Sequence, residues 1–180
     1  MADGMTAPEF ARPIRLDTIG AEPRAVRIEA DEAERRALAA RFGLLALASL
    51  EVEATLVRDR DVVRAQGRIV GAATQACVAT GEPVPARVEE PFALRFVPAR
   101  EDGDEIELDE DDLDTLPYLG GAIDLGEAAA QGFALALDPF PRSAGADAAL
   151  RAAGVLSEEE AEQARREASP FAALKVLKRD

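Results

Sequence analysis

Apolar and polar side chains alternate along two neighbouring runs, on either side of the polar stretch Arg58-Asp59-Arg60-Asp61. Alternation with a period of two is typical of a strand with one buried face, so these runs predict a hairpin that turns at this stretch. A register with Leu56 opposite Val63 and Glu51 opposite Arg68 gives the hairpin one apolar and one polar face.

A third alternating run extends from Val84 to Phe96 and is interrupted by Glu90-Pro91. Because proline cannot donate to a β-ladder, this pattern predicts a long strand with a bulge or an edge position at Pro91.

Helix signals frame these strands. Asp31 and Glu34 have capping-box spacing and predict a helix over about 32–42, and Gly43 suits its C-terminal end. The same spacing at Asp124 and Glu127 predicts a helix over about 125–137, and Ser157 with Glu160 begins another. These elements predict an α+β fold with a mainly antiparallel sheet, either a meander or partly closed and barrel-like, and a few short helices.

Composition along the chain suggests three parts. Residues 1–141 hold the strands and most helices and form a single α+β domain with an acidic loop at 101–116. Residues 142–155 are rich in Ala and Gly and are interpreted as a linker, and 156–180 as a C-terminal helical tail.

Charge and composition narrow the chemistry. The 180 residues include 21 Lys and Arg, 35 Asp and Glu, no His and one Cys, with a formal charge of −14. Without His there is no imidazole base or His-ligated metal, and one Cys makes neither an internal disulfide nor a thiolate metal site. No P-loop, dinucleotide-binding or nucleophile-elbow motif is present, so we expect no catalytic residues, cofactor or metal.

The acidic excess is local, because Glu101 to Asp114 holds ten acids and no base. The segment does not fit the EF-hand template, so it is interpreted as a solvated loop that aids solubility or attracts a basic polypeptide. The start of the chain lacks a basic, apolar signal sequence, and Leu44–Leu50 is too short to cross a bilayer. We therefore expect a cytoplasmic protein that binds neither membrane nor DNA.

Four arginines around the predicted hairpin, Arg58, Arg60, Arg64 and Arg68, are candidates for contact with RNA phosphates. The alternative is that Arg68 pairs with Glu51 and Arg58 with Asp61 across the hairpin. Since residues 1–100 are nearly neutral and only 4% of all residues are aromatic, we favour this pairing, and direct RNA contact stays open.

The segment Cys77-Val78-Ala79-Thr80-Gly81-Glu82-Pro83 resembles the central motif of the YceD family, the large ribosomal RNA subunit accumulation proteins. Many members have C-x-R-C followed by L-E-P. Here Cys77, Glu82 and Pro83 match, while Thr80 stands at the second cysteine. The acidic loop, the stretch from Ile123 to Pro139 and the segment Ser169–Leu174 agree in order with the family.

The resemblance implies an accessory factor that supports synthesis, processing or accumulation of 23S rRNA and acts by binding. Its implied partner is a basic ribosomal protein, an rRNA-processing factor or a pre-ribosomal particle. Cys77, Glu82 and Pro83 then become candidate contacts, as do Phe171 and Leu174, whose helical spacing suits docking on the body or on the partner. Paired cysteines in relatives could hold zinc, but one thiol without His cannot.

Overall fold

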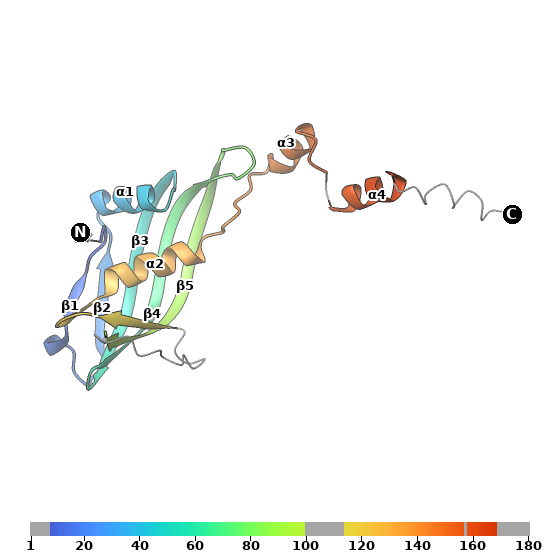
Figure 1. The fold of residues 1–180 in the computed structure, drawn as a ribbon. Helices are drawn as coiled ribbons and strands as arrows, with labels where there is room; N and C mark the ends of the chain where they lie inside the picture. The colour runs from blue at the N-terminus through green and yellow to red at the C-terminus, as the bar shows by residue number, and fades with distance from the viewer. Residues whose placement is uncertain (1–7, 100–113, 157, 169–180) are drawn as a thin grey trace, which may run out of the picture.

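The computed structural model describes residues 8–99, 114–156 and 158–168. Its body is a five-stranded sheet in the order β2-β3-β4-β5-β6, beside a separate pair of short strands, β1 and β7 (Figure 1). The strand bounds are Pro13–Arg15 (β1), Arg24–Glu29 (β2), Ala46–Asp59 (β3), Val62–Ala76 (β4), Pro83–Pro98 (β5), Thr115–Tyr118 (β6) and Ala122–Asp124 (β7). A short 3-10 helix, Leu16–Thr18, follows β1.

The predicted α+β class is confirmed. Strands β2 to β5 form an antiparallel meander, and β6 joins β5 in parallel. Of the two architectures expected, the meander is present, and the described strands do not close into a barrel.

The β3–β4 hairpin turns over two residues rather than four. Asp59 already lies opposite Val62, and Arg60 in the turn has a positive φ of 56°. The predicted register is therefore wrong by two residues, so that Glu53 and not Glu51 faces Arg68. Because a shift of two keeps every side chain on its face, the predicted apolar and polar faces are correct.

Strand β5 passes Pro91 without a bulge, in unbroken register with β4. The N–H of Arg95 points away from β4 and donates to the carbonyl oxygen of Asp114 at 2.9 Å, so odd-numbered N–H groups face the outer edge of β5. Proline at an odd position removes a donor from that edge and none from the ladder. The expected edge position is thus confirmed and the expected bulge is wrong, since the irregularity lies in β3 between Leu47 and Ser49.

The helix α1 (Glu32–Arg41) begins with the predicted capping box. The Asp31 carboxylate accepts from the N–H of Glu34, and the Glu34 carboxylate accepts from the N–H of Asp31, each at 2.8 Å. Gly43 follows the helix with a φ of +65°, which glycine adopts without steric penalty. The expected helix over 32–42 is confirmed to within one residue.

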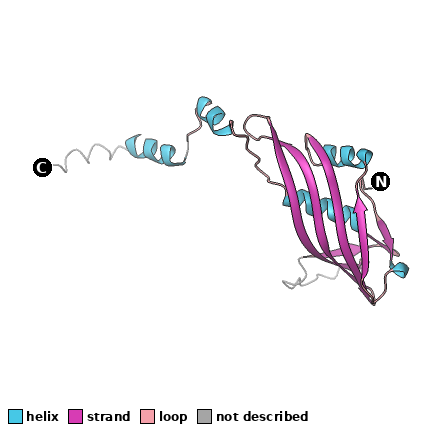
Figure 2. Ribbon diagram, turned by 180° about the vertical axis from the view of Figure 1, so that it is seen from behind, coloured by secondary structure: helices cyan, strands magenta, loops and turns pink. Residues whose placement is uncertain are grey.

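The helix α2 (Leu125–Ala136) lies across one face of β3, β4 and β5 (Figure 1). Its N-terminus is capped by Asp124, whose side chain accepts from the N–H of Glu127 at 3.0 Å. Seen from behind, the opposite face of the sheet carries none of the described helices (Figure 2). The sheet therefore has one covered apolar face and one open polar face.

Glycines on the covered face let α2 approach the sheet closely. Phe133 is completely buried, and a Cβ at Gly71 would stand 2.4 Å from its ring. A Cβ at Gly132 would likewise stand 2.9 Å from the side chain of Ile69. The side chains of Phe133 and Ile69 would have to shift to admit a methyl group at these positions, so the two glycines let α2 pack closely on β4.

An ion-pair cluster ties α1 to α2. Arg41 donates to both carboxylate oxygens of Glu127, at 2.7 and 2.9 Å, and to Glu9 at 2.8 Å. These hydrogen bonds from Arg41 lower the pKa of Glu127 and hold it ionised. The cluster fixes the two helices relative to each other at the N-terminal end of α2.

Two short helices follow the body. One of them, α3 (Ala146–Ala152), lies within the stretch 142–155, which we interpreted as a linker, so this stretch has regular structure. The other, α4 (Glu158–Ala168), lies in the predicted tail. Thr115 and Leu116 of the predicted acidic loop belong to β6, and its residues 101–113 lie outside the described residues. The division into domain, linker and tail stays a prediction.

None of the helices in the described part of the chain is both long enough and apolar enough to cross a bilayer.

Candidate functional site

The predicted contact residues that flank β4 form two groups, one at each end of the strand. Arg58 and Arg60 lie at the hairpin turn that precedes β4, whereas Cys77 and Glu82 lie in the loop that follows it. The 15 residues of β4 span about 50 Å at about 3.3 Å per residue. The two groups therefore cannot form one site.

At the hairpin turn, Arg58 has a structural role. Its guanidinium donates to the carbonyl oxygens of Leu16 and Arg60, each at 2.7 Å, and lies 4.0 Å from Asp61. The predicted Arg58–Asp61 pair is confirmed, and Arg60 sits exposed in the turn itself.

Arg64 and Arg68 lie on the open face of the sheet. Arg68 donates to Glu53 at 3.3 Å and to Glu89 at 3.0 Å, so its predicted pairing with Glu51 is wrong because of the register. Arg64 is exposed, has no hydrogen bond or ion pair among the described residues, and lies opposite Arg95 in the β4–β5 ladder.

The family-like segment forms a tight loop between β4 and β5, which we call the motif loop (residues 75–83). The N–H of Cys77 donates to the carbonyl oxygen of Glu82 at 2.8 Å, and the N–H of Gly81 to that of Cys77 at 2.9 Å. Gly81 has a φ of +75°, in the region where glycine avoids strain. Pro83, the last residue of the motif loop, is the first residue of β5.

The segment that follows α2 is fastened to the motif loop, and we call it the clasp segment (residues 138–146). The N–H of Val78 donates to the carbonyl oxygen of Pro141 at 2.9 Å. The side-chain amide of Gln75 donates to the carbonyl oxygen of Asp138 at 2.8 Å. The motif loop therefore anchors a segment about 60 residues further along the chain.

Three side chains join the same two segments. The hydroxyl of Ser143 donates to Glu82 Oε2 at 2.7 Å, and the hydroxyl of Thr80 lies 3.2 Å from the same oxygen. The two hydroxyl oxygens lie 3.3 Å apart. Glu82 thus holds the clasp segment in place, and the role that its position suggests is structural.

Cys77 lies beneath this network with 3% of its surface exposed. Burial opposes ionisation of a thiol, but a hydrogen bond from the backbone of Ser143 favours the thiolate and is the largest cause of a lowered pKa of Cys77, about 6. The hydroxyls of Thr80 and Ser143 favour the thiolate less, because each has one proton and both lie within hydrogen-bond distance of Glu82. The motif loop and the clasp segment therefore both favour the ionised form of Cys77.

This thiolate predicts a specific pH dependence of stability. The pKa of Cys77 is about 6 in the folded protein and that of a free thiol is about 8.5. Ionisation of Cys77 therefore stabilises the folded state fully above about pH 8.5, and this stabilisation is lost as the pH falls through about 6. Wild type should therefore gain stability over Cys77→Ser between pH 5.5 and 8.5 in urea unfolding. A pH-independent difference between the two proteins would contradict the assignment.

The motif loop does not fit a zinc ion. Structural zinc sites use four Cys or His ligands, whereas the groups around Cys77 are two hydroxyls and one carboxylate that already hydrogen-bond to each other. Across the described ranges, no group of three or more His, Cys, Asp or Glu side chains is suitably placed for a metal ion.

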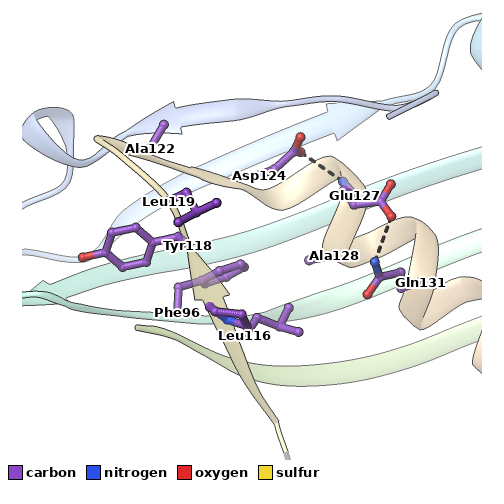
Figure 3. Close-up of a pocket in the computed structure, with 10 residues that line it drawn as sticks. Phe96, Leu116, Tyr118, Leu119, Ala122, Asp124, Glu127, Ala128 and Gln131 are labelled. Carbon is purple, nitrogen blue, oxygen red and sulfur yellow. Dashed lines mark hydrogen bonds between the residues drawn. The ribbon is translucent and has the colours of Figure 1, made fainter. Parts of the chain in front are cut away.

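A groove of about 500 Å³ lies between β6 and α2, toward the hairpin-turn end of the molecule (Figure 3). Leu116 and Leu119 line one side, and Asp124 and Glu127 the other. Asp124 accepts from backbone N–H groups, and Glu127 is bound by Arg41, so both carboxylates are already engaged. The groove therefore presents apolar surface, and neither Asp124 nor Glu127 is available there as a catalytic acid or base.

Residue-level reasoning missed a group of exposed apolar side chains beside the motif loop. Val78 is 56% exposed and Phe140 71%, and the bond between Val78 and Pro141 makes their segments neighbours. Phe140 could have been found from the sequence, because it lies between two prolines. A residue in that position is not expected in a helix or strand whose apolar face would bury it. No comparable signal marked Ser143. The predicted contacts Phe171 and Leu174 lie outside the described residues.

Comparison with known proteins gives one match. The family model described as "Large ribosomal RNA subunit accumulation protein YceD" matches residues 65–178, or 114 of the 180 residues, including the motif loop, α2 and the clasp segment. No curated protein and no solved structure matches the chain. The chain belongs to the YceD family of large ribosomal RNA subunit accumulation proteins.

Proposed function

We propose that this protein is a cytoplasmic accessory factor that supports synthesis, processing or stability of 23S rRNA during biogenesis of the large ribosomal subunit. The observation that carries the proposal is the family match, which covers the motif loop and the segment that the loop holds. The name of the family describes accumulation of the large ribosomal RNA.

We infer further that the protein acts by binding and not by catalysis. The chain has no His, and the polar groups of its central motif are engaged with each other: Glu82 binds Ser143, and Cys77 lies buried beneath them. A motif built in this way supports a surface, whereas a catalytic group must reach a substrate.

Charge supports a basic partner. The formal charge of −14 favours encounter with a positively charged protein and opposes encounter with free RNA. A basic ribosomal protein, an rRNA-processing factor or a pre-ribosomal particle that presents such a protein fits this balance.

Deletion of the gene tests the function. We expect mature 23S rRNA to fall relative to 16S rRNA, to recover when the intact chain is supplied, and not to be restored by an unrelated acidic protein. A ratio that stays at the wild-type value in the deletion strain would refute the role. Affinity purification with and without nuclease then separates the modes of action, since a protein partner that resists nuclease supports protein capture.

Direct RNA binding by the hairpin is a second candidate, favoured by Arg64, which is exposed on the open face and has no hydrogen bond or ion pair among the described residues. An exposed guanidinium without a carboxylate partner can bind a phosphate. A mobility shift with large-subunit rRNA fragments across a salt series tests this candidate. Binding that is absent at low salt, or that survives Arg64→Ala with Arg68→Ala, would exclude the hairpin.

A further inference from the structure

Exposed apolar side chains gather at one end of the described molecule. Four of them, from three separate parts of the chain, form what we call the motif-end patch: Leu45 (55% exposed), Val78 (56%), Leu135 (87%) and Phe140 (71%). Large side chains exposed to this degree in one region are typical of an interaction surface.

Hydrogen bonds place the parts that carry these side chains next to each other. The N–H of Leu45 donates to the carbonyl oxygen of Thr74 at 2.8 Å, and the neighbouring Gln75 holds Asp138. Asp138 follows the end of α2, which carries Leu135, and leads directly to Phe140. The patch is thus assembled by the motif loop and the clasp segment together, and its position depends on the contacts between them.

The chain around the patch is acidic. The segment that carries Leu135 and Phe140, residues 135–147, contains two acids, Asp138 and Asp147, and one base, Arg142. Arg142 is paired with Asp147 at 3.3 Å. Glu82 adds a further carboxylate from the motif loop. A large apolar centre with a negative surround is complementary to a segment that carries both apolar and positively charged side chains.

We propose that the motif-end patch binds a short segment of a basic protein. Apolar side chains of that segment pack on Val78 and Phe140, and its Lys or Arg side chains pair with the surrounding carboxylates. This inference rests on the proposed function and specifies the surface and the chemistry of the partner. The motif loop acts as the support that holds both halves of the patch together.

Two other occupants fit less well. RNA would bring phosphates against the carboxylates, and the patch offers one aromatic side chain for stacking. A second copy in a symmetric dimer would place each acidic surround against itself, which costs free energy.

A labelled peptide tests the patch on the full chain. The probe is a fluorescein-labelled 12-residue peptide of six lysines and six leucines, and its charge control replaces every leucine with serine. We expect wild type to bind the leucine peptide at least tenfold more tightly than the serine peptide. The double variant Val78→Asp with Phe140→Asp should lose this tenfold preference, because it puts two further charges where leucines would pack.

Leu119→Asp is the matched control, since Leu119 is 75% exposed beside Tyr118. The Tyr118 hydroxyl bonds Asp61 at the hairpin turn, so this position lies at the other end of the sheet. Leu119→Asp should leave the preference unchanged, and equal melting temperatures exclude unfolding as the cause of any loss.

Three results would overturn the proposal. One is an unchanged preference in the double variant, and another is an equal loss in the Leu119→Asp control. The third is a tenfold gain in peptide affinity for Phe171→Asp with Leu174→Asp, since it would assign the patch to the chain's own C-terminal segment. Normal 23S rRNA in the deletion strain with an intact peptide preference would refute the function alone, so the two failures are distinguishable.

Discussion

Replacing Phe133 with alanine is expected to lower the free energy of unfolding by about 3–5 kcal/mol. Phe133 is completely buried in the core cluster between α2 and the sheet, and its ring lies directly over Gly71. Truncation removes the apolar surface that α2 buries and leaves a cavity that rigid strands cannot fill. Urea unfolding followed by circular dichroism measures the loss.

The same helix supplies the control. Leu135 is 87% exposed, so Leu135→Ala should change stability by less than about 0.5 kcal/mol. If Phe133→Ala cost no more than Leu135→Ala, the packing of α2 on β4 described above would be wrong. In a Phe133→Leu background the added Gly71→Ala methyl should cost less than in wild type, because the ring edge that it meets is gone.

Gly67→Ala is expected to cost about 3 kcal/mol or more, at the upper end of overpacking effects. A Cβ at this position would stand 2.0 Å from the carbonyl oxygen of Glu53 and 2.8 Å from the Cα of Ala54. Both are backbone atoms of the paired strand, so no rotamer change relieves the clash and the ladder itself must move. Thermal and urea unfolding of the variant measure the effect.

Gly121→Ala is the comparison, because nothing lies within 4 Å of a Cβ there and its φ is not in the left-handed region. It should be neutral or slightly stabilising, since alanine restricts the unfolded chain. Equal stabilities for the two variants would show that β3 and β4 do not approach as closely at Gly67 as described.

The local rules of the sequence predicted much of this fold. Helix α1 follows from the Asp31–Glu34 capping box, and α2 from the cap at Asp124, because these signals lie within one turn of the residues they control. The faces of β3 and β4 follow from alternation alone. The register of β3 with β4 does not follow from alternation. A shift of two residues keeps every side chain on its face, so the sequence pattern fits both registers equally well.

The candidate site was less predictable, since its contacts are long-range. The bond from Ser143 to Glu82 joins residues 61 apart, and neither residue type nor spacing marks such a pair. The wrong pairing of Arg68 with Glu51 followed from the register error. The resemblance directed attention to Cys77 and Glu82, and only the structure shows that these residues support a neighbouring surface.

The placement of proline along β5 has a consequence for how the protein avoids self-association. Odd-numbered N–H groups of this strand face its outer edge, and three of the six odd positions from 83 to 93 are proline. That edge therefore lacks half of the donors that an incoming strand would need. Among the described strands, β6 is the one that pairs there, and it covers only Arg95 to Pro98. A long strand can stay uncovered there without recruiting other chains into aggregates. Partners must then be recognised through side chains rather than by extending the sheet at this edge.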